Sequence, residues 1–129
     1  MNKKYSILIV DDDKFLLEMY RKKFDHYGIV PELSVGSEDA LTKLRGGFAP
    51  DVLVLDIIMP GIDGLELLEI VRKENLSQKS IVIMLTNEGE SAKIEKAKSL
   101  GAVGYIIKAT SIPSEVTEEI IRIADANIK

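Results

Sequence analysis

The chain alternates between short apolar runs and longer amphipathic stretches along its whole length. Runs of four or five residues rich in valine, isoleucine and leucine, without strict polar alternation, are typical of strands buried on both faces. We expect five strands, of which the second is the weakest: Ile7–Val10, Glu32–Val35, Val52–Leu55, Ile81–Leu85 and Tyr105–Ile107.

The stretches that follow these runs carry apolar residues at helical spacing. Ser37 and Ser111 are expected to act as helix N-caps, and Pro113 suits the first turn of the last helix. In that helix Val116, Ile120 and Ile123 should face inward. The predicted helices are Lys14–Tyr27, the stretch from Ser37 to the Gly46-Gly47 pair, Gly64–Glu74, Ser91–Leu100 and the stretch after Ser111.

A strand followed by a helix, five times over, predicts an α/β fold with helices on both faces of a parallel sheet. Right-handed crossovers with one reversal of winding give a doubly wound five-stranded parallel sheet in the order 2-1-3-4-5, a flavodoxin-like three-layer sandwich. No linker, repeat or low-complexity tract divides the chain, so we expect residues 1–129 to form a single domain.

Composition removes several classes of chemistry. The 129 residues include no cysteine and one histidine, His26, which excludes disulfides, thiolate zinc sites and paired-histidine metal sites. The net charge of −4 gives no general footprint for nucleic acid. Met1 to Tyr5 is not a signal peptide, and no apolar stretch approaches the roughly 20 residues that span a bilayer. We therefore expect a cytoplasmic protein without membrane insertion or direct nucleic-acid binding.

Polar side chains follow four of the five predicted strands. The first strand ends in Asp11, Asp12 and Asp13, the third in Asp56, the fourth in Thr86 and the fifth in Lys108. Ligands of such sheets bind at the carboxyl ends of the strands, near the reversal of winding. A run of aspartates alone is more often a solvated acidic turn, but Asp56 follows four apolar residues at the rim of a buried strand. Together the carboxylates predict an oxygen-only site for a hard cation such as Mg²⁺.

A carboxylate beside a bound cation, with a lysine and a threonine hydroxyl at the same point, suits phosphoryl transfer onto an aspartate oxygen. Asp56 is assigned as the nucleophile because it lies on the central strand without an adjacent carboxylate. Asp11 and Asp12 are assigned as metal ligands, and Lys108 balances charge on the phosphoryl oxygens. Asp13 is interpreted as a solvent-facing charge at a helix N-terminus.

These motifs strongly resemble the receiver domain of response regulators, the phosphoacceptor module of two-component signalling. The similarity covers Tyr5 to about Asn127 and rests on four motifs in order: Ile7 to Asp13, Leu53 to Gly64, Leu85-Thr86, and Tyr105 to Lys108. By position, Asp56 matches the phosphoacceptor, Asp12 the direct metal ligand and Asp11 its acidic partner. The backbone carbonyl of Ile58 matches a third protein ligand of Mg²⁺, for which Mn²⁺ is the alternative ion.

The resemblance implies a switch and its partners. Thr86 matches the hydroxyl that moves toward the phosphoryl group, Lys108 the phosphate-binding lysine, and Tyr105 the aromatic residue whose rotamer follows Thr86. A sensor histidine kinase or histidine phosphotransfer protein would donate the phosphoryl group. A downstream protein would read the face made by the fourth helix, fifth strand and fifth helix, and a phosphorylation-dependent dimer is left open. Such a domain catalyses only its own phosphorylation and dephosphorylation.

The chain departs from the family pattern near the site. Ala109 replaces the usual proline after the lysine, often in a cis bond, which puts the aim of Lys108 and the surface near Thr110 in question. Asn87 is bulkier than the usual small residue after the threonine. Ile58 and Glu88 occupy positions that tune the lifetime of the phosphoryl group, and an apolar Ile58 cannot orient an attacking water. We therefore expect slow self-dephosphorylation.

Pro60, Gly61 and Gly64 are interpreted as a strand stop followed by a flexible loop.

Three alternatives compete with the phosphoacceptor interpretation. Ala109 favours a degenerate receiver that acts as a phosphorylation-independent interaction module. Asp11 and Asp13 could mimic the Asp-x-Asp motif of a haloacid-dehalogenase-like phosphatase, although no aspartate follows Lys108 until Asp125. A flavodoxin-like cofactor protein is disfavoured by the acidic first turn and by an aromatic content of only 5%.

Overall fold

The computed structural model describes residues 5–87, 91–108 and 112–128. Over these residues a single parallel sheet in the order β2-β1-β3-β4-β5 confirms the predicted doubly wound architecture. The strands are β1 (Ile7–Asp11), β2 (Glu32–Val35), β3 (Val52–Asp56), β4 (Ile81–Thr86) and β5 (Gly104–Ile107). The helices are α1 (Lys14–Asp25), α2 (Ser37–Arg45), α3 (Gly64–Lys73), α4 (Ser91–Ser99) and α5 (Pro113–Asn127).

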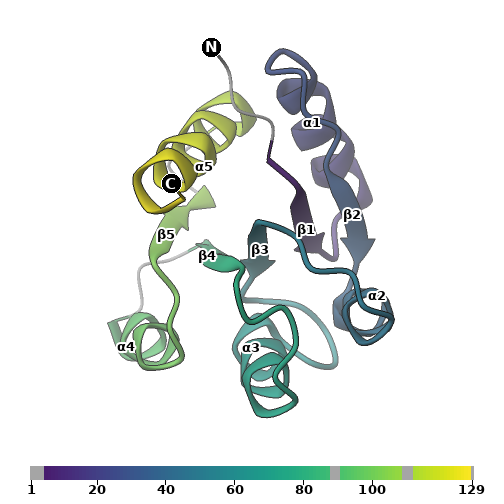
Figure 1. The fold of residues 1–129 in the computed structure, drawn as a ribbon. Coiled ribbons are helices and arrows are strands. Elements are labelled where there is room, and N and C mark those ends of the chain that lie inside the picture. The colour runs from purple at the N-terminus through teal and green to yellow at the C-terminus, as the bar shows by residue number, and fades with distance from the viewer. Residues whose placement is uncertain (1–4, 88–90, 109–111, 129) are drawn as a thin grey trace.

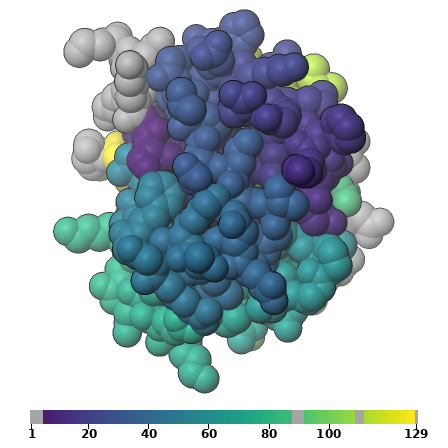
Figure 2. Space-filling view, turned by 90° about the vertical axis from the view of Figure 1, so that its right-hand side faces the viewer, coloured from purple at the N-terminus to yellow at the C-terminus, as the bar shows by residue number. Residues whose placement is uncertain are grey.

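The helices form two outer layers. Figure 1 shows α1 and α5 on one side of the sheet, and α2, α3 and α4 on the other. Viewed from the β2 edge, the surface is built mostly by the first half of the chain, coloured purple to teal (Figure 2). None of the helices in the described part of the chain is long and apolar enough to cross a membrane.

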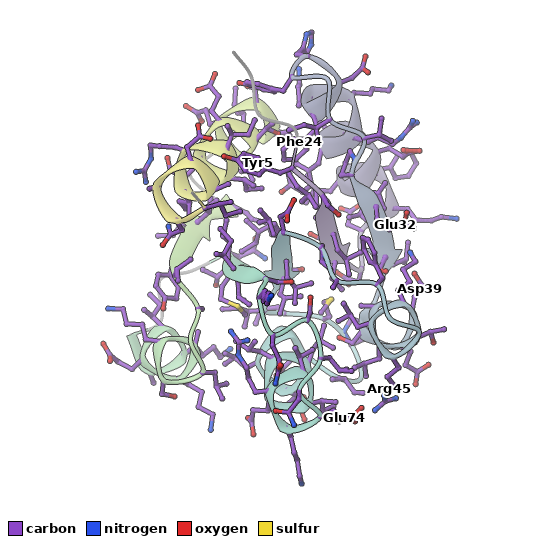
Figure 3. All side chains as sticks on the ribbon, in the orientation of Figure 1. Tyr5, Phe24, Glu32, Asp39, Arg45 and Glu74 are labelled. Carbon is purple, nitrogen blue, oxygen red and sulfur yellow. The ribbon has the colours of Figure 1, made fainter. Side chains whose placement is uncertain are left out.

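Two apolar cores fill the spaces between the layers. Because successive side chains of a strand point to opposite faces, alternate residues of each strand enter different cores. Ile7 and Ile9 of β1 pack with Leu17 and Phe24 on the α1/α5 side, whereas Leu8 and Val10 pack toward α2 and α3. Tyr5 and Phe24 lie inside the α1/α5 layer in Figure 3, with the labelled charged residues around the outside of β2, α2 and α3. This alternation decides which side chains can meet at the strand ends.

The predicted helix caps were partly wrong. Gly36, not Ser37, is the N-cap of α2, with a φ of 92° that favours glycine. Ser37 is the first helical residue, and its hydroxyl donates to the carbonyl of Ile62 at 2.7 Å. Ile112 is the N-cap of α5, and its amide donates to Glu115 Oε1 at 3.0 Å, so the cap is not Ser111, which lies outside the described residues. Serine is a preferred N-cap residue, which is why both serines were predicted as caps. The backbone conformation at the start of each helix instead places the N-cap at Gly36 and at Ile112.

Two glycines in the loop after β3 have different roles. Gly61 has a φ of 76° and therefore supplies backbone freedom, as expected. Gly64 is needed for space instead, because an added Cβ would lie 2.1 Å from the backbone oxygen of Asp56. Its amide donates to the carbonyl of Ile57 at 2.9 Å. The start of α3 therefore rests directly on the backbone of the predicted nucleophile.

Candidate functional site

The two central acidic side chains are the last residues of neighbouring strands. Asp11 ends β1 and is fully buried, and Asp56 ends β3 with 2% of its surface exposed. Alternation from Ile9 and Val54 places both side chains on the α1/α5 side of the sheet. The two carboxylates predicted to meet at this edge of the sheet therefore do meet there, since both contact Lys108. Figure 1 shows β1 and β3 as neighbouring strands.

Lys108 joins the two carboxylates. It follows β5 directly, and its stem reaches past the end of β4, the strand between β3 and β5. Its ammonium lies 3.1 Å from Asp11 Oδ2 and 3.2 Å from Asp56 Oδ2. The aim of Lys108, which Ala109 had put in question, is thus toward both aspartates, while Ala109 and Thr110 themselves lie outside the described residues.

Burial and mutual repulsion govern the electrostatics of this group. Burial, followed by the charge of Asp11, raises the pKa of Asp56 to about 7, against the opposing charge of Lys108. Burial also raises the pKa of Asp11. For Lys108 burial acts in the other direction, but the charges of Asp11 and Asp56 outweigh it and raise the pKa. One lysine therefore compensates two buried carboxylates incompletely, and the pocket favours a further cation.

The arrangement of oxygen atoms fits a divalent ion. One carboxylate oxygen from each of Asp11, Asp12 and Asp56 lies within 4.8 Å of the others. Asp56 Oδ1 is buried and has no hydrogen-bond partner among the described residues. An acceptor left without a donor in a site of oxygen ligands is satisfied by a hard cation. Asp12 is exposed and completes the group from the solvent side.

These side chains open into a pocket of about 470 Å³. Ile58 is 51% exposed at its rim, and Asn87 also contributes to its wall. Asp13 serves as the N-cap of α1, where its carboxylate accepts from the amide of Leu16 at 3.1 Å, so its assignment to a helix terminus holds. The pocket is lined by Asp11, Asp12, Asp13, Leu16, Tyr20, Asp56, Ile58, Asn87, Lys108 and Pro113.

Thr86 and Tyr105 lie on the other face of the sheet. Thr86 ends β4 and is 4% exposed, and alternation places it with Met84 on the side of α3 and α4. It is not among the residues that line the pocket. Tyr105 is half-buried on the adjacent strand, where its hydroxyl donates to the carbonyl of Ala102 at 3.3 Å and Lys98 Nζ lies 5.9 Å from its ring. The two predicted switch residues therefore share a face, separate from the carboxylates.

Sequence reasoning missed two residues that shape the site. Gly64 sets how closely α3 approaches Asp56, a contact that no local pattern reveals. Tyr20 lies within the predicted helix Lys14–Tyr27 and was given no role in the site, yet it lines the pocket. The sequence signal that could have identified Tyr20 was its hydroxyl, because the other buried residues of α1 are Leu17 and Phe24. Glu88, expected to influence the lifetime of the phosphoryl group, lies outside the described residues.

Comparison with known proteins supports one family. The family model described as the response regulator receiver domain matches residues 7–120. The chain is 35% identical over 102 residues to the Regulator of RpoS of Escherichia coli (strain K12), covering 79% of this chain and 29% of that protein. It is 29% identical over 131 residues to a nitrate/nitrite response regulator homolog of Haemophilus influenzae, covering 99% of this chain and 61% of that protein. The chain thus spans less than two thirds of these curated relatives.

Solved structures agree with this similarity over nearly the whole fold. The chemotaxis protein CheY4 of Vibrio cholerae superposes with a TM-score of 0.82 at 26% identity, covering 94% of this chain and 99% of that one. The receiver domain of the Francisella response regulator 1452 superposes with a TM-score of 0.78 at 30% identity, covering 95% and 98%. The residues matched by the family model, 7–120, include β1 to β5 and therefore Asp11, Asp56 and Lys108.

Proposed function

Because the chain belongs to the response regulator receiver family, we propose that it accepts a phosphoryl group on Asp56 in a Mg²⁺-dependent reaction and thereby changes a protein-binding surface. The observation that carries this proposal is the buried Asp11–Lys108–Asp56 cluster, with Lys108 Nζ at 3.1 and 3.2 Å from the two carboxylates. Asp56 Oδ1, which has no hydrogen-bond partner among residues 5–87, 91–108 and 112–128, offers the position for an incoming electrophile or cation. In an ion cluster with a purely structural role, a buried carboxylate oxygen is normally paired with a hydrogen-bond donor.

In the proposed reaction a carboxylate oxygen of Asp56 attacks the phosphorus of a phosphohistidine. The new O–P bond forms as the N–P bond breaks, and the imidazole nitrogen keeps the electron pair. Lys108 stabilises negative charge on the transferring oxygens from a fixed position. Asp11, Asp12, Asp56 and the carbonyl of Ile58 would hold Mg²⁺, or alternatively Mn²⁺, which supplies further charge compensation when bound.

Phosphorylation would act through Thr86 and Tyr105. A phosphoryl group adds negative charge and acceptor oxygens at the end of β3, and the Thr86 hydroxyl at the neighbouring strand end can turn toward it. Tyr105 would then move into the space that Thr86 leaves. On β5 the half-buried Tyr105 lies between Val103, 45% exposed, and Ile107, 37% exposed. This apolar row supports the face of α4, β5 and α5 as the surface read by a downstream partner or a second copy.

The lifetime of the phosphoryl group would be long. Ile58 lies at the pocket rim, and its side chain offers no polar atom to position an attacking water. The domain would therefore catalyse only its own phosphorylation and a slow hydrolysis, with a sensor histidine kinase or phosphotransfer protein as donor.

Stoichiometric labelling tests the proposal. The full chain is incubated with Mg²⁺ and acetyl phosphate, and intact mass spectrometry should show one added phosphoryl group, labile at alkaline pH. Asp56→Asn should abolish labelling, whereas Asp25→Asn, which removes an exposed carboxylate at the far end of α1, should not. An unlabelled wild-type chain would instead indicate a degenerate receiver, and multiple turnover of a phosphomonoester would indicate a phosphatase.

A further inference from the structure

Among the buried residues of α1, Tyr20 is the one whose side chain carries a polar group, a hydroxyl. These buried residues are Leu17, Tyr20 and Phe24, and Tyr20 is only 1% exposed. A phenylalanine would fill a purely apolar position without introducing a hydroxyl. Because burying a hydroxyl without a hydrogen bond is costly, we expect a partner of this hydroxyl among its neighbours.

The hydroxyl faces the acidic pocket. Long side chains on a helix lean toward its N-terminus, and α1 begins at Lys14, directly after the aspartates. Tyr20 accordingly lines the pocket beside Asp11, Asp56 and Lys108. Burial raises the pKa of Tyr20, and the charges of Asp11 and Asp56 raise it further, so the group stays a neutral donor. Its hydroxyl is therefore available to donate a hydrogen bond to an anionic oxygen or to water.

The hydroxyl has no protein partner within the described ranges, unlike those of two other tyrosines. Tyr5 donates to Asp125 and Tyr105 donates to the carbonyl of Ala102. Tyr20 thus borders the same pocket as Asp56 Oδ1, the buried oxygen that has no hydrogen-bond partner among the described residues. A pocket of about 470 Å³ with several polar walls has room for ordered water between them.

We propose that Tyr20 is a positioning residue of the phosphoacceptor site, whose hydroxyl donates a hydrogen bond, through pocket water, to the oxygen atoms around Asp56. In the metal-free protein the bridging water would donate in turn to the carboxylate. In the loaded protein the same water would lie against the cation or an oxygen of the phosphoryl group. This inference rests on the proposed function of Asp56 and adds a residue on α1 to the groups that stabilise the charged state.

Tyr20→Phe tests this role, because it removes the hydroxyl and keeps the ring in the core. Tyr27→Phe is the matched control, since Tyr27 follows the same helix, is half-buried and lines a different pocket. Both variants and the wild type are titrated with beryllofluoride in the presence of Mg²⁺, with amide chemical shifts as the readout. Loss of one hydrogen bond that reaches the site through a neutral water should weaken binding by about 3- to 10-fold in Tyr20→Phe only.

A spectroscopic signature separates positioning from packing. With ¹³Cζ-labelled tyrosine, the Tyr20 resonance of the wild type should shift on addition of Mg²⁺ and again with beryllofluoride, and the Tyr27 resonance should not. Unchanged affinity in Tyr20→Phe together with an unmoved Tyr20 resonance would show that the residue only packs. A wild type that fails to bind beryllofluoride would overturn the role of Asp56, and this inference with it, whereas normal binding with a silent Tyr20 overturns the inference alone.

Discussion

Among the residues that the structure describes, two lysines each contact two carboxylates, and these two clusters differ in burial rather than in composition. Lys108 contacts Asp11 and Asp56, and Lys43 contacts Asp39 at 2.9 Å and Glu32 at 3.1 Å. The carboxylates around Lys108 are at most 3% exposed, whereas those around Lys43 are 51% and 53% exposed. Each cluster has one lysine and two direct carboxylate partners.

The pKa values move in opposite directions. The hydrogen bond from Lys43, aided by Ser34, lowers the pKa of Asp39, because solvent already stabilises its charge. Burial raises the pKa of Asp56 to about 7 despite an equally close lysine. The Lys43 cluster ties α2 to the edge strand β2, and Glu32 and Asp39 lie on that outer side in Figure 3. The Lys108 cluster is left short of positive charge, which favours the binding of a further cation.

Removing the lysine between the two buried carboxylates should give the largest effect. Lys108→Met leaves Asp11 and Asp56 buried without a counter-ion, and breaking such a pair costs about 3 kcal/mol or more. Urea unfolding at pH 8 without divalent ions should report this loss, and labelling by acetyl phosphate should disappear. Lys108→Arg serves as the control that keeps the charge. A Lys108→Met protein as stable as the wild type would show that the carboxylates do not depend on this lysine.

The pH dependence of stability sharpens the comparison next. Since the folded pKa of Asp56 is raised, the folded state binds a proton more tightly than the unfolded chain, so stability falls as pH rises through about 7. At about 1.4 kcal/mol per pKa unit, the metal-free domain should be roughly 2 kcal/mol more stable at pH 5.5 than at pH 8. Asp39 has the opposite sign, so its smaller contribution is lost only as pH falls through its lowered pKa.

Urea unfolding across this pH range measures the effect. Asp56→Asn should flatten the dependence between pH 5.5 and 8, and saturating Mg²⁺ should reduce it by favouring the ionised carboxylate. Asp39→Asn is the matched control and should leave that interval unchanged. A wild-type curve that rises from pH 5.5 to 8 would contradict the assignment of a raised pKa to Asp56.

The contrast also explains what could be predicted from sequence. The positions of Asp11, Asp56 and Lys108 followed from strand ends, because the carboxyl ends of parallel strands meet at one edge whatever the details of packing. Thr86 and Tyr105 were correctly placed at neighbouring strands, but alternation separates their face from the pocket. The roles of Gly64 and Tyr20 depend on how helices approach the sheet, and the burial of Asp56 sets its pKa. These quantities arise only from tertiary contacts.

The smallest expected effect comes from the exposed cluster. Lys43→Met removes ion pairs to half-exposed carboxylates and a hydrogen bond to Ser34 Oγ at 3.1 Å, and it should cost about 1 kcal/mol or less. Because solvent reaches this cluster, 1 M NaCl should shrink the difference from the wild type. The extent of Asp56 labelling should stay within about two-fold of the wild type, since Lys43 does not line the pocket. If Lys43→Met cost as much as Lys108→Met in urea unfolding, burial would not be what distinguishes the two clusters, and the raised pKa of Asp56 would need another cause.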